Sequence, residues 1–219
     1  MDDIIRFISF IAVYALPIIF AITLHEAAHG YVARYFGDNT AYALGRVSIN
    51  PLKHIDPLGT IAIPVALAIL TSGAFIFGYA KPVPVTFGNL RNPKRDMIWV
   101  ALAGPASNFV QALFWAFLGF TLMSLGVRDN EIFKAGILVN ALMFAFNLFP
   151  LPPLDGGRIV TGLLPKNLAV PYARTERYGI FIVLALVAFA PLRPLLNLWV
   201  VPLTAFVYRS INLLVGPFY

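Results

Sequence analysis

The sequence predicts an all-α polytopic membrane protein with about five to six transmembrane segments, one interrupted helix, and short re-entrant or strand-like loops. Three observations lead to this fold class. Of the 219 residues, 59% are hydrophobic and 12% are charged, whereas a soluble domain carries roughly 25% charged residues. The mean hydropathy of the chain is +0.80. Apolar runs of about 20 residues, the length that crosses a bilayer, recur along the sequence.

Six apolar segments are candidate membrane spans, at 4–36, 58–77, 97–126, 132–150, 178–192 and 195–215. The polar loop after the first span suits a short strand or hairpin over 42–49. Before the third span, prolines and spaced valines suit an extended segment, and Asn92-Pro93 predicts the start of a helix. Three prolines interrupt the helix expected over 132–150. We expect one domain over 1–219, with a core at about 4–165 and C-terminal helices at about 172–215.

Lysine and arginine residues predict the orientation of the spans, because cytoplasmic loops collect them. Segments 34–57, 78–96 and 155–177 are expected inside, and the N-terminus and 127–135 outside. The apolar segment 58–77 then starts and ends on one side, so we expect it to be re-entrant or to cross and return. An ordinary helix that breaks the charge rule is the alternative. The net charge of +6 is spread between apolar runs, which fits a lipid bilayer as partner and not nucleic acid.

Residues 25–29 read His25-Glu26-Ala27-Ala28-His29, inside the first apolar span. Ionisable groups at that depth are costly unless they face a cavity, a partner or a metal. On a helix, residues four apart share a face, so both imidazoles can bind one Zn²⁺ while Glu26 takes a proton from its water. The chain has no cysteine, so any metal binds through imidazole and carboxylate. The alternative is a histidine pair satisfied by hydrogen bonds on a buried helix.

A catalytic zinc ion needs a third protein ligand, and Asp155 is the first candidate. It follows the proline-rich break, and Gly156 and Gly157 let the chain turn there. Asp155 can also be read as the N-cap of a helix that begins near Gly156. His54 is a weaker candidate for the ligand, because it lies in a polar loop and suits an interfacial position.

At this point the chain resembles the site-2 protease family of intramembrane zinc metalloproteases. The resemblance rests on the histidine motif together with Asn147-x-x-Pro-x-x-Pro-Leu-Asp155-Gly on a later, interrupted span. Two further segments match, Gly104-Pro105-Ala-Ser-Asn108 and Gly78-Tyr-Ala-Lys81-Pro-Val-Pro-Val85. The matching region runs from about residue 20 to 160. We find neither a PDZ-like insertion nor another regulatory domain, so a short form of the family is expected.

The resemblance implies the roles of five residues and the reaction. His25, His29 and Asp155 are implied to bind one Zn²⁺ per chain, and Glu26 to act as the general base. Asn147 is implied to hold the substrate or its oxyanion. The implied substrate is a transmembrane helix of another membrane protein, cleaved near the cytoplasmic side. An integral, multi-pass protein of a prokaryotic cell membrane is expected. The oligomeric state is left open.

Several residues keep competing interpretations. Gly104 and Pro105 suit close helix packing, whereas Asn108 can also hydrogen-bond a metal ligand or the substrate. Asn147 can instead satisfy backbone groups left open by the nearby proline. Segment 81–85 either offers a strand edge to an unwound substrate or is a passive loop. Arg158 either pairs with a carboxylate or anchors at the interface.

Two other functions remain as alternatives, a polytopic zinc or ion transporter and a non-catalytic membrane adaptor. Interrupted helices with inward-facing histidine and aspartate also suit ion sites. A base beside the metal site, Glu26, favours hydrolysis over transport. The presence of all proposed ligands together with this base argues against an adaptor.

Overall fold

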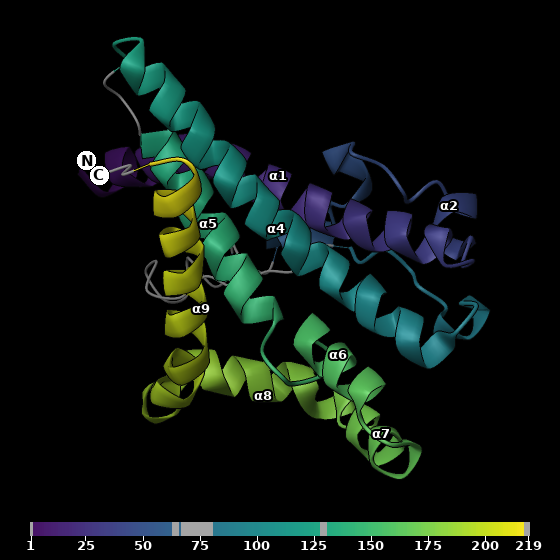
Figure 1. Cartoon of the computed structure of the whole chain (residues 1–219). Coiled ribbons are helices and arrows are strands. Elements are labelled where there is room, and N and C mark those ends of the chain that lie inside the picture. Colours follow the sequence, from purple (N-terminus) through teal and green to yellow (C-terminus); the bar gives the residue numbers. More distant parts are fainter. Residues whose placement is uncertain (1, 63–65, 67–80, 128–130, 217–219) are drawn as a thin grey trace.

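Long helices dominate the computed structural model, which describes residues 2–62, 66, 81–127 and 131–216. Within these residues, three helical stretches are long and apolar enough to cross a membrane: Ile8–Tyr35, Pro93–Ser124 and Ala190–Leu214. They belong to α1 (Asp2–Tyr35), α4 (Pro93–Ser124) and α9 (Arg193–Leu214) (Figure 1). No strand occurs in the described residues. The predicted all-α membrane class is confirmed.

Two shorter helices occupy the positions of the remaining predicted spans. Helix α5 (Glu131–Asn147) has 17 residues, and α8 (Glu176–Ala188) has 13. At about 1.5 Å per residue, α5 reaches most of a hydrocarbon core and α8 does not. The span expected over 58–77 begins with a π-helical turn, η2 (Pro57–Ala62), and its remainder lies almost wholly outside the described residues.

The interrupted helix predicted around 150 is present. Helix α5 ends at Asn147, and α6 (Asp155–Leu163) and α7 (Lys166–Ala173) follow after a proline-rich break. The break folds back tightly over the start of α6. A Cβ atom at Gly156 would collide with the carbonyl of Leu148, so glycine is required there by close backbone approach. As the sequence predicts, α4 starts directly after Asn92, with Pro93 at its first position.

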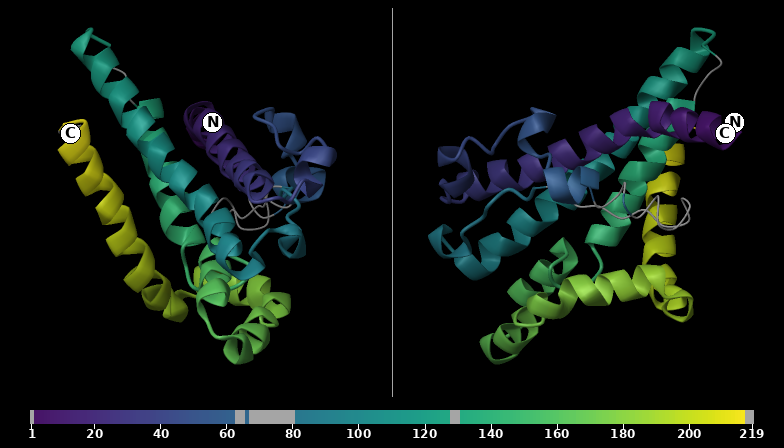
Figure 2. Two further views of the ribbon diagram at one scale, coloured as in Figure 1. Left: turned by 45° about the vertical axis from the view of Figure 1, so that its right-hand side comes forward. Right: turned by 180° about the vertical axis from the view of Figure 1, so that it is seen from behind.

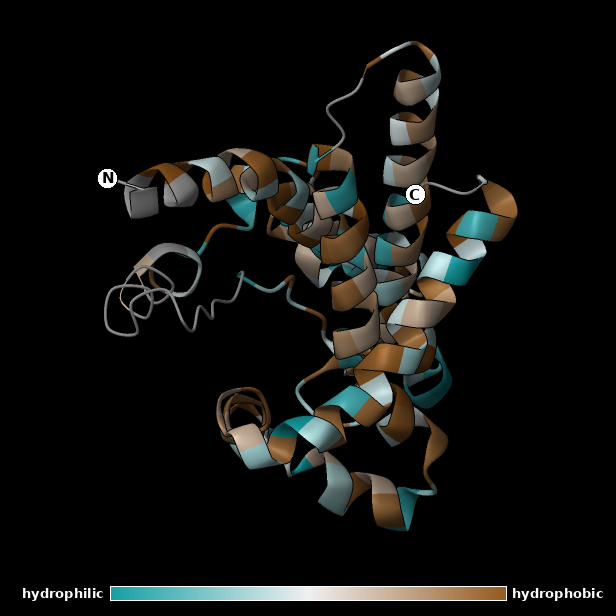
Figure 3. Ribbon diagram, turned by 90° about the vertical axis from the view of Figure 1, so that its left-hand side faces the viewer, coloured by the Kyte–Doolittle hydropathy of each residue, from teal (hydrophilic) through white to brown (hydrophobic). Residues whose placement is uncertain are grey.

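Helix α4 lies at the centre of the molecule and packs against α1, α5 and α6. Figure 2 shows α4 and α5 between α1 on one side and α9 on the other. The apolar core between α4, α5 and α9 includes Trp115, Ile137 and Val207. Apolar residues predominate along the long helices (Figure 3), and many large apolar side chains are exposed on their outer faces. This surface fits a lipid environment.

The polar loop after α1 differs from its prediction. The strand or hairpin expected over 42–49 is wrong, because 40–43 form a single helical turn, α2 (Thr40–Ala43), and the following residues are irregular. Three short 3₁₀ turns lie in the described loops. They are η1 (Pro51–Lys53) after α2, η3 (Phe87–Asn89) before α4, and η4 (Ala190–Leu192) before α9. Side-chain hydrogen bonds organise this loop in place of a strand ladder: Arg46 Nη2 donates to the carbonyls of Lys81 and Pro82, at 2.9 and 3.3 Å.

Asp38 joins the end of α1 to the segment that follows Lys81. Its carboxylate is buried and accepts hydrogen bonds from the backbone and hydroxyl of Thr40, and from the backbone of Thr86 at 2.7 Å. Burial alone would raise the pKa of this carboxyl, but these hydrogen bonds outweigh burial and lower the pKa below its ordinary value. Asp38 therefore anchors segment 81–86 to α1 in its ionised form.

Candidate metal centre

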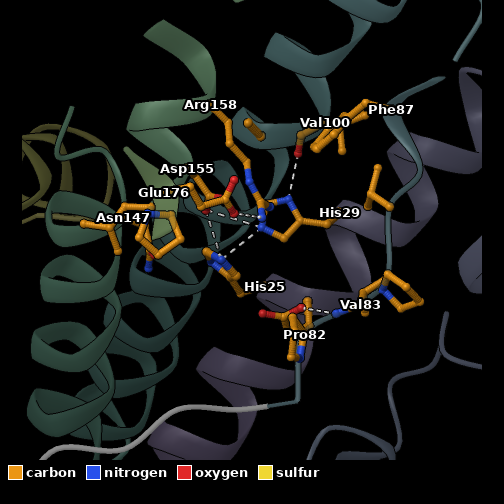
Figure 4. Close-up of a pocket in the computed structure, with 16 residues that line it drawn as sticks. His25, His29, Pro82, Val83, Phe87, Val100, Asn147, Asp155, Arg158 and Glu176 are labelled. Carbon is orange, nitrogen blue, oxygen red and sulfur yellow. Dashed lines mark hydrogen bonds and ion pairs between the residues drawn. The ribbon is translucent and has the colours of Figure 1, made fainter. Parts of the chain in front are cut away.

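His25 and His29 lie one turn apart on α1, and α6 brings Asp155 against both (Figure 4). The two Nε2 atoms are 3.1 Å apart. Asp155 Oδ2 lies 3.2 Å from Nε2 of His25 and 3.3 Å from Nε2 of His29. All three side chains are buried. The structure thus brings together the three residues that the resemblance implies as ligands.

The hydrogen bonds around the two imidazoles decide which nitrogen carries the proton. His29 Nδ1 lies 2.7 Å from the carbonyl oxygen of Val100, which can only accept, so Nδ1 is the donor. His25 Nδ1 lies 2.6 Å from Asn108 Oδ1 and donates to it. In a neutral histidine the other ring nitrogen, Nε2, is then unprotonated and carries a lone pair. Both Nε2 lone pairs are therefore directed to the space beside Asp155.

With both histidines neutral, three hydrogen-bond acceptors converge in this space. Asp155 Oδ2 is buried and lies close to both Nε2 atoms. Such an arrangement is stabilised by a cation, which is either a metal ion among the three atoms or a second proton on one imidazole. Tetrahedral zinc with nitrogen and oxygen ligands at about 2.0–2.2 Å keeps its ligand atoms about 3.3–3.5 Å apart. The observed separations of 3.1–3.3 Å lie at or slightly below this range, and the nitrogen and oxygen donors are those that zinc prefers, so the residues suit a zinc ion.

Asp155 meets the two histidines, and His54 does not. Asp155 is the first residue of α6, and the cap position is occupied by Leu154, so Asp155 is not the N-cap. His54 is buried elsewhere, and its Nε2 donates to the carbonyl of Ser48 at 2.7 Å. It is not part of the group of ligand atoms that lie within 4.8 Å of one another, which comprises His25, His29 and Asp155.

Glu26 and Asn147 line the same cavity, which has a volume of about 520 Å³. Glu26 Oε2 accepts a hydrogen bond of 2.7 Å from the backbone N–H of Val83. Asn147 Nδ2 donates to the carbonyl of Met143, one turn earlier on α5, at 3.0 Å. Residues 82–85 form one wall of the cavity. The cavity therefore combines the candidate ligands, a carboxylate and a carboxamide.

Arg158 and Glu176 also line the cavity, and their side chains are 3.6 Å apart. Of the two interpretations of Arg158, the pairing with a carboxylate is the one that the structure shows. Sequence reasoning did not single out Glu176, nor Val100, which acts through its backbone carbonyl. Gly104 lies against the metal centre, since a Cβ atom there would be 2.6 Å from His25 Nε2. The expected packing role of Gly104 is thus a contact with the metal centre itself.

Comparison with known proteins identifies the family. A family model described as "Peptidase family M50" matches residues 126–190. The chain is 37% identical over 187 residues to "Putative zinc metalloprotease YwhC" of Bacillus subtilis, a match that covers 82% of this chain and 81% of that protein. The chain belongs to peptidase family M50, the site-2 proteases. A further relative, "Putative zinc metalloprotease Rip2" of Mycolicibacterium smegmatis, is 30% identical over 207 residues, a match that covers 90% of this chain and 74% of that protein. No solved structure matches the chain.

As a member of family M50, the protein is an intramembrane zinc metalloprotease with one zinc ion. It is a membrane protein that acts in a bilayer on membrane-protein substrates. The family assignment favours hydrolysis over the transporter and adaptor alternatives. The candidate metal centre and its cavity match this activity, because a zinc peptidase needs a site that holds zinc and admits a peptide bond.

Proposed function

We propose that the protein hydrolyses peptide bonds in or near transmembrane helices. In this proposal His25, His29 and Asp155 bind the zinc ion, and Glu26 is the general base. One observation carries this proposal. Nε2 of His25, Nε2 of His29 and Oδ2 of Asp155 are buried and lie 3.1 to 3.3 Å from one another in a cavity that Glu26 also lines. The proposal treats residues 1–219 as a single catalytic domain.

Zinc, when bound, lowers the pKa of water to about 7 and polarises a carbonyl. Glu26 accepts the proton of the attacking water and later donates it to the leaving amine. The hydrogen bond from the Val83 N–H fixes one carboxylate oxygen of Glu26 at the cavity wall. The other oxygen, Oε1, is then the one that exchanges the proton.

Asn147 is positioned to assist in the same cavity. A carboxamide has two N–H donors, and one of them is directed to the carbonyl of Met143. The second donor is available to the oxyanion that forms during hydrolysis or to the substrate backbone. The alternative role, satisfying a backbone group of α5, uses only the first donor, so both roles are compatible.

Residues 81–85 are proposed to receive the unwound substrate. Helical peptide bonds are protected by their own hydrogen bonds, so the substrate must be extended before cleavage. Pro82, Val83, Pro84 and Val85 line the cavity beside the metal centre. Arg46 and Asp38 hold this segment at its two ends through its backbone groups. A braced, irregular segment of this kind suits pairing with an extended peptide.

The active site is proposed to lie towards the cytoplasmic side of a prokaryotic cell membrane. The lysine- and arginine-rich segments around α2, the start of α4 and α7 lie on the same side of the molecule in Figure 1, opposite the N-terminus. The backbone N–H of Lys81 donates to the carbonyl of His54 at 2.9 Å. This contact supports a chain path that returns to the side it left. Both relatives named above come from bacteria.

Replacement of Glu26 by glutamine tests the proposed base. Glu26→Gln keeps the size of the side chain but removes the basic oxygen, so zinc content is expected to stay the same while cleavage is lost. A general base contributes about 10²–10⁴-fold to the rate. The assay is cleavage of a co-expressed single-span membrane protein tagged at both ends, with zinc measured on the purified enzyme. Glu131→Gln, the same change at an exposed position on α5, is the matched control. Undiminished cleavage by Glu26→Gln would contradict the mechanism.

A further inference from the structure

Two asparagine side chains lie completely buried between α1, α4 and α5. Asn108 of α4 and Asn140 of α5 are both 0% exposed. Asn108 faces the metal centre through His25, whereas Asn140 contacts no candidate ligand. Buried carboxamides in a membrane helix are costly unless all their groups are paired. The partners of both carboxamides are therefore informative about their role.

Two backbone carbonyls, those of Gly136 and Ala21, set the direction of the hydrogen bonds in this group. The carbonyl of Gly136 can only accept, so Asn140 directs Nδ2 to it, at 2.9 Å. Asn140 Oδ1 is then turned to Asn108 and accepts from its Nδ2 at 2.9 Å. Asn108 Nδ2 also lies 3.2 Å from the carbonyl of Ala21. The nitrogen side of the Asn108 carboxamide is thus occupied by two acceptors.

The oxygen side of Asn108 is consequently left for His25. Asn108 Oδ1 lies 2.6 Å from His25 Nδ1 and can only accept there. The proton of the imidazole is thereby held on Nδ1, and Nε2 presents its lone pair to Asp155 and His29. His29 needs no such relay, because the Val100 carbonyl holds its Nδ1 directly. The two histidines are oriented by different means with the same result.

We propose that Asn108 and Asn140 are positioning residues for zinc binding, with Asn140 acting through Asn108 to hold His25 in its metal-binding tautomer. This inference rests on the proposed ligands. Val100, Gly104 and Asn108 are spaced four apart on α4, so they form one stripe that faces the histidine pair of α1. Outer-shell hydrogen bonds of this kind fix the ring orientation of metal-binding histidines.

A purely structural role makes a different prediction. Carboxamides that link transmembrane helices stabilise their association, and their loss would weaken the fold without a specific effect on the metal. The two roles are separated by measuring zinc affinity and thermal unfolding on the same variants. The full-length protein in detergent is stripped of metal and titrated with zinc against a chelator of known affinity.

Asn108→Leu removes the acceptor of His25 and is expected to weaken zinc binding about 10–100-fold. Asn108→Asp keeps an oxygen acceptor for His25 but has no donor for Asn140 Oδ1 or the Ala21 carbonyl. It is expected to lower thermal stability and to retain most of the zinc affinity. Gln111→Leu is the matched control, because Gln111 is a buried carboxamide on the same helix whose amide atoms have no hydrogen-bond partner in the described part of the chain. Its affinity is expected to equal that of the wild type. Wild-type affinity in Asn108→Leu would overturn the proposal.

Asn140→Leu tests the relay itself. In the wild-type background this change removes the shorter of the two contacts that hold Asn108 Nδ2 and leaves the one to the Ala21 carbonyl. The Asn108 carboxamide is then less firmly oriented, so zinc affinity is expected to fall. In the Asn108→Asp background it is expected to have no effect on zinc affinity, because the two oxygens of a carboxylate are equivalent and need no orientation. An equal loss in both backgrounds would show a structural role and overturn the proposal. This comparison also decides the matter if Asn108→Leu fails to fold.

Because the measured quantity is zinc affinity and not cleavage, the experiment can contradict this inference and the proposed function separately. A wild-type protein that binds zinc through this site and cleaves no substrate would contradict the proposed function alone. A wild-type protein that cleaves, with Asn108→Leu binding zinc normally, would contradict this inference alone.

Discussion

Gly104 lies against both imidazoles of the metal centre, and its replacement by alanine tests how closely this centre is packed. In the wild type, α4 passes the histidine pair with no side chain between them. A Cβ atom at this position would lie 2.6 Å from His25 Nε2 and would also meet His29 Nε2. Ordinary van der Waals contact begins near 3.4 Å. Relief of the contact with His25 Nε2 alone requires a shift of about 0.8 Å, and the closer contact with His29 Nε2 requires a larger one, by a ring or by the whole of α4.

The size of the effect follows from the restraints on the rings. Each Nδ1 is held by α4 itself, through Asn108 and Val100, so the rings cannot move without lengthening these hydrogen bonds. Overpacking of a well-packed interior costs about 1–3 kcal/mol. If this cost falls on the metal-binding arrangement, zinc affinity decreases by about 5- to 150-fold. Cleavage falls in parallel at zinc concentrations that do not saturate the variant.

Zinc affinity is measured by chelator competition, and stability by thermal unfolding of the metal-free protein. Ala116→Val is the control, because Ala116 is completely buried in the apolar core between α4, α5 and α9, about three turns beyond Gly104 on the same helix. Ala116 does not line the catalytic cavity. It is expected to reduce stability and leave zinc affinity unchanged. Wild-type zinc affinity in Gly104→Ala, or an equal loss in both variants, would refute the reasoning.

Two further predictions follow. Asp155→Ala is expected to lose zinc and His54→Ala to keep it, as measured by metal analysis of the purified proteins; zinc retained by Asp155→Ala would exclude this residue as the third ligand. Asp38 has a lowered pKa in the folded protein, so its ionised form adds stability above its ordinary pKa, and this gain disappears as the pH falls below about 4. Thermal unfolding of wild type and Asp38→Asn is therefore expected to converge on acidification, and a difference that grows at low pH would reverse the assigned sign.

Local features of the chain were predictable where backbone chemistry decides them. Asn92-Pro93 marks the start of α4 because proline fits the first helical turn. The prolines after Asn147 end α5 because proline cannot continue a helix. The strand expected over 42–49 was wrong, since the pattern of a short polar loop does not reveal that Arg46 and Asp38 will bond to distant backbone groups.

Some features of the metal centre could likewise be predicted from the sequence, and others depend on the tertiary structure. Four-residue spacing alone places His25 and His29 on one helical face, and the cost of burying them in an apolar span points to a metal. The proline-rich break and the family motif already favoured Asp155 over His54, but the approach of Asp155 to both histidines depends on how α6 packs against α4. The hydrogen bond between His25 and Asn108 spans 83 residues of sequence and becomes visible only in the folded chain. Sequence neighbours determine helices and their ends through backbone preferences, whereas packing determines which distant polar groups meet, because burial forces each of them to find a partner.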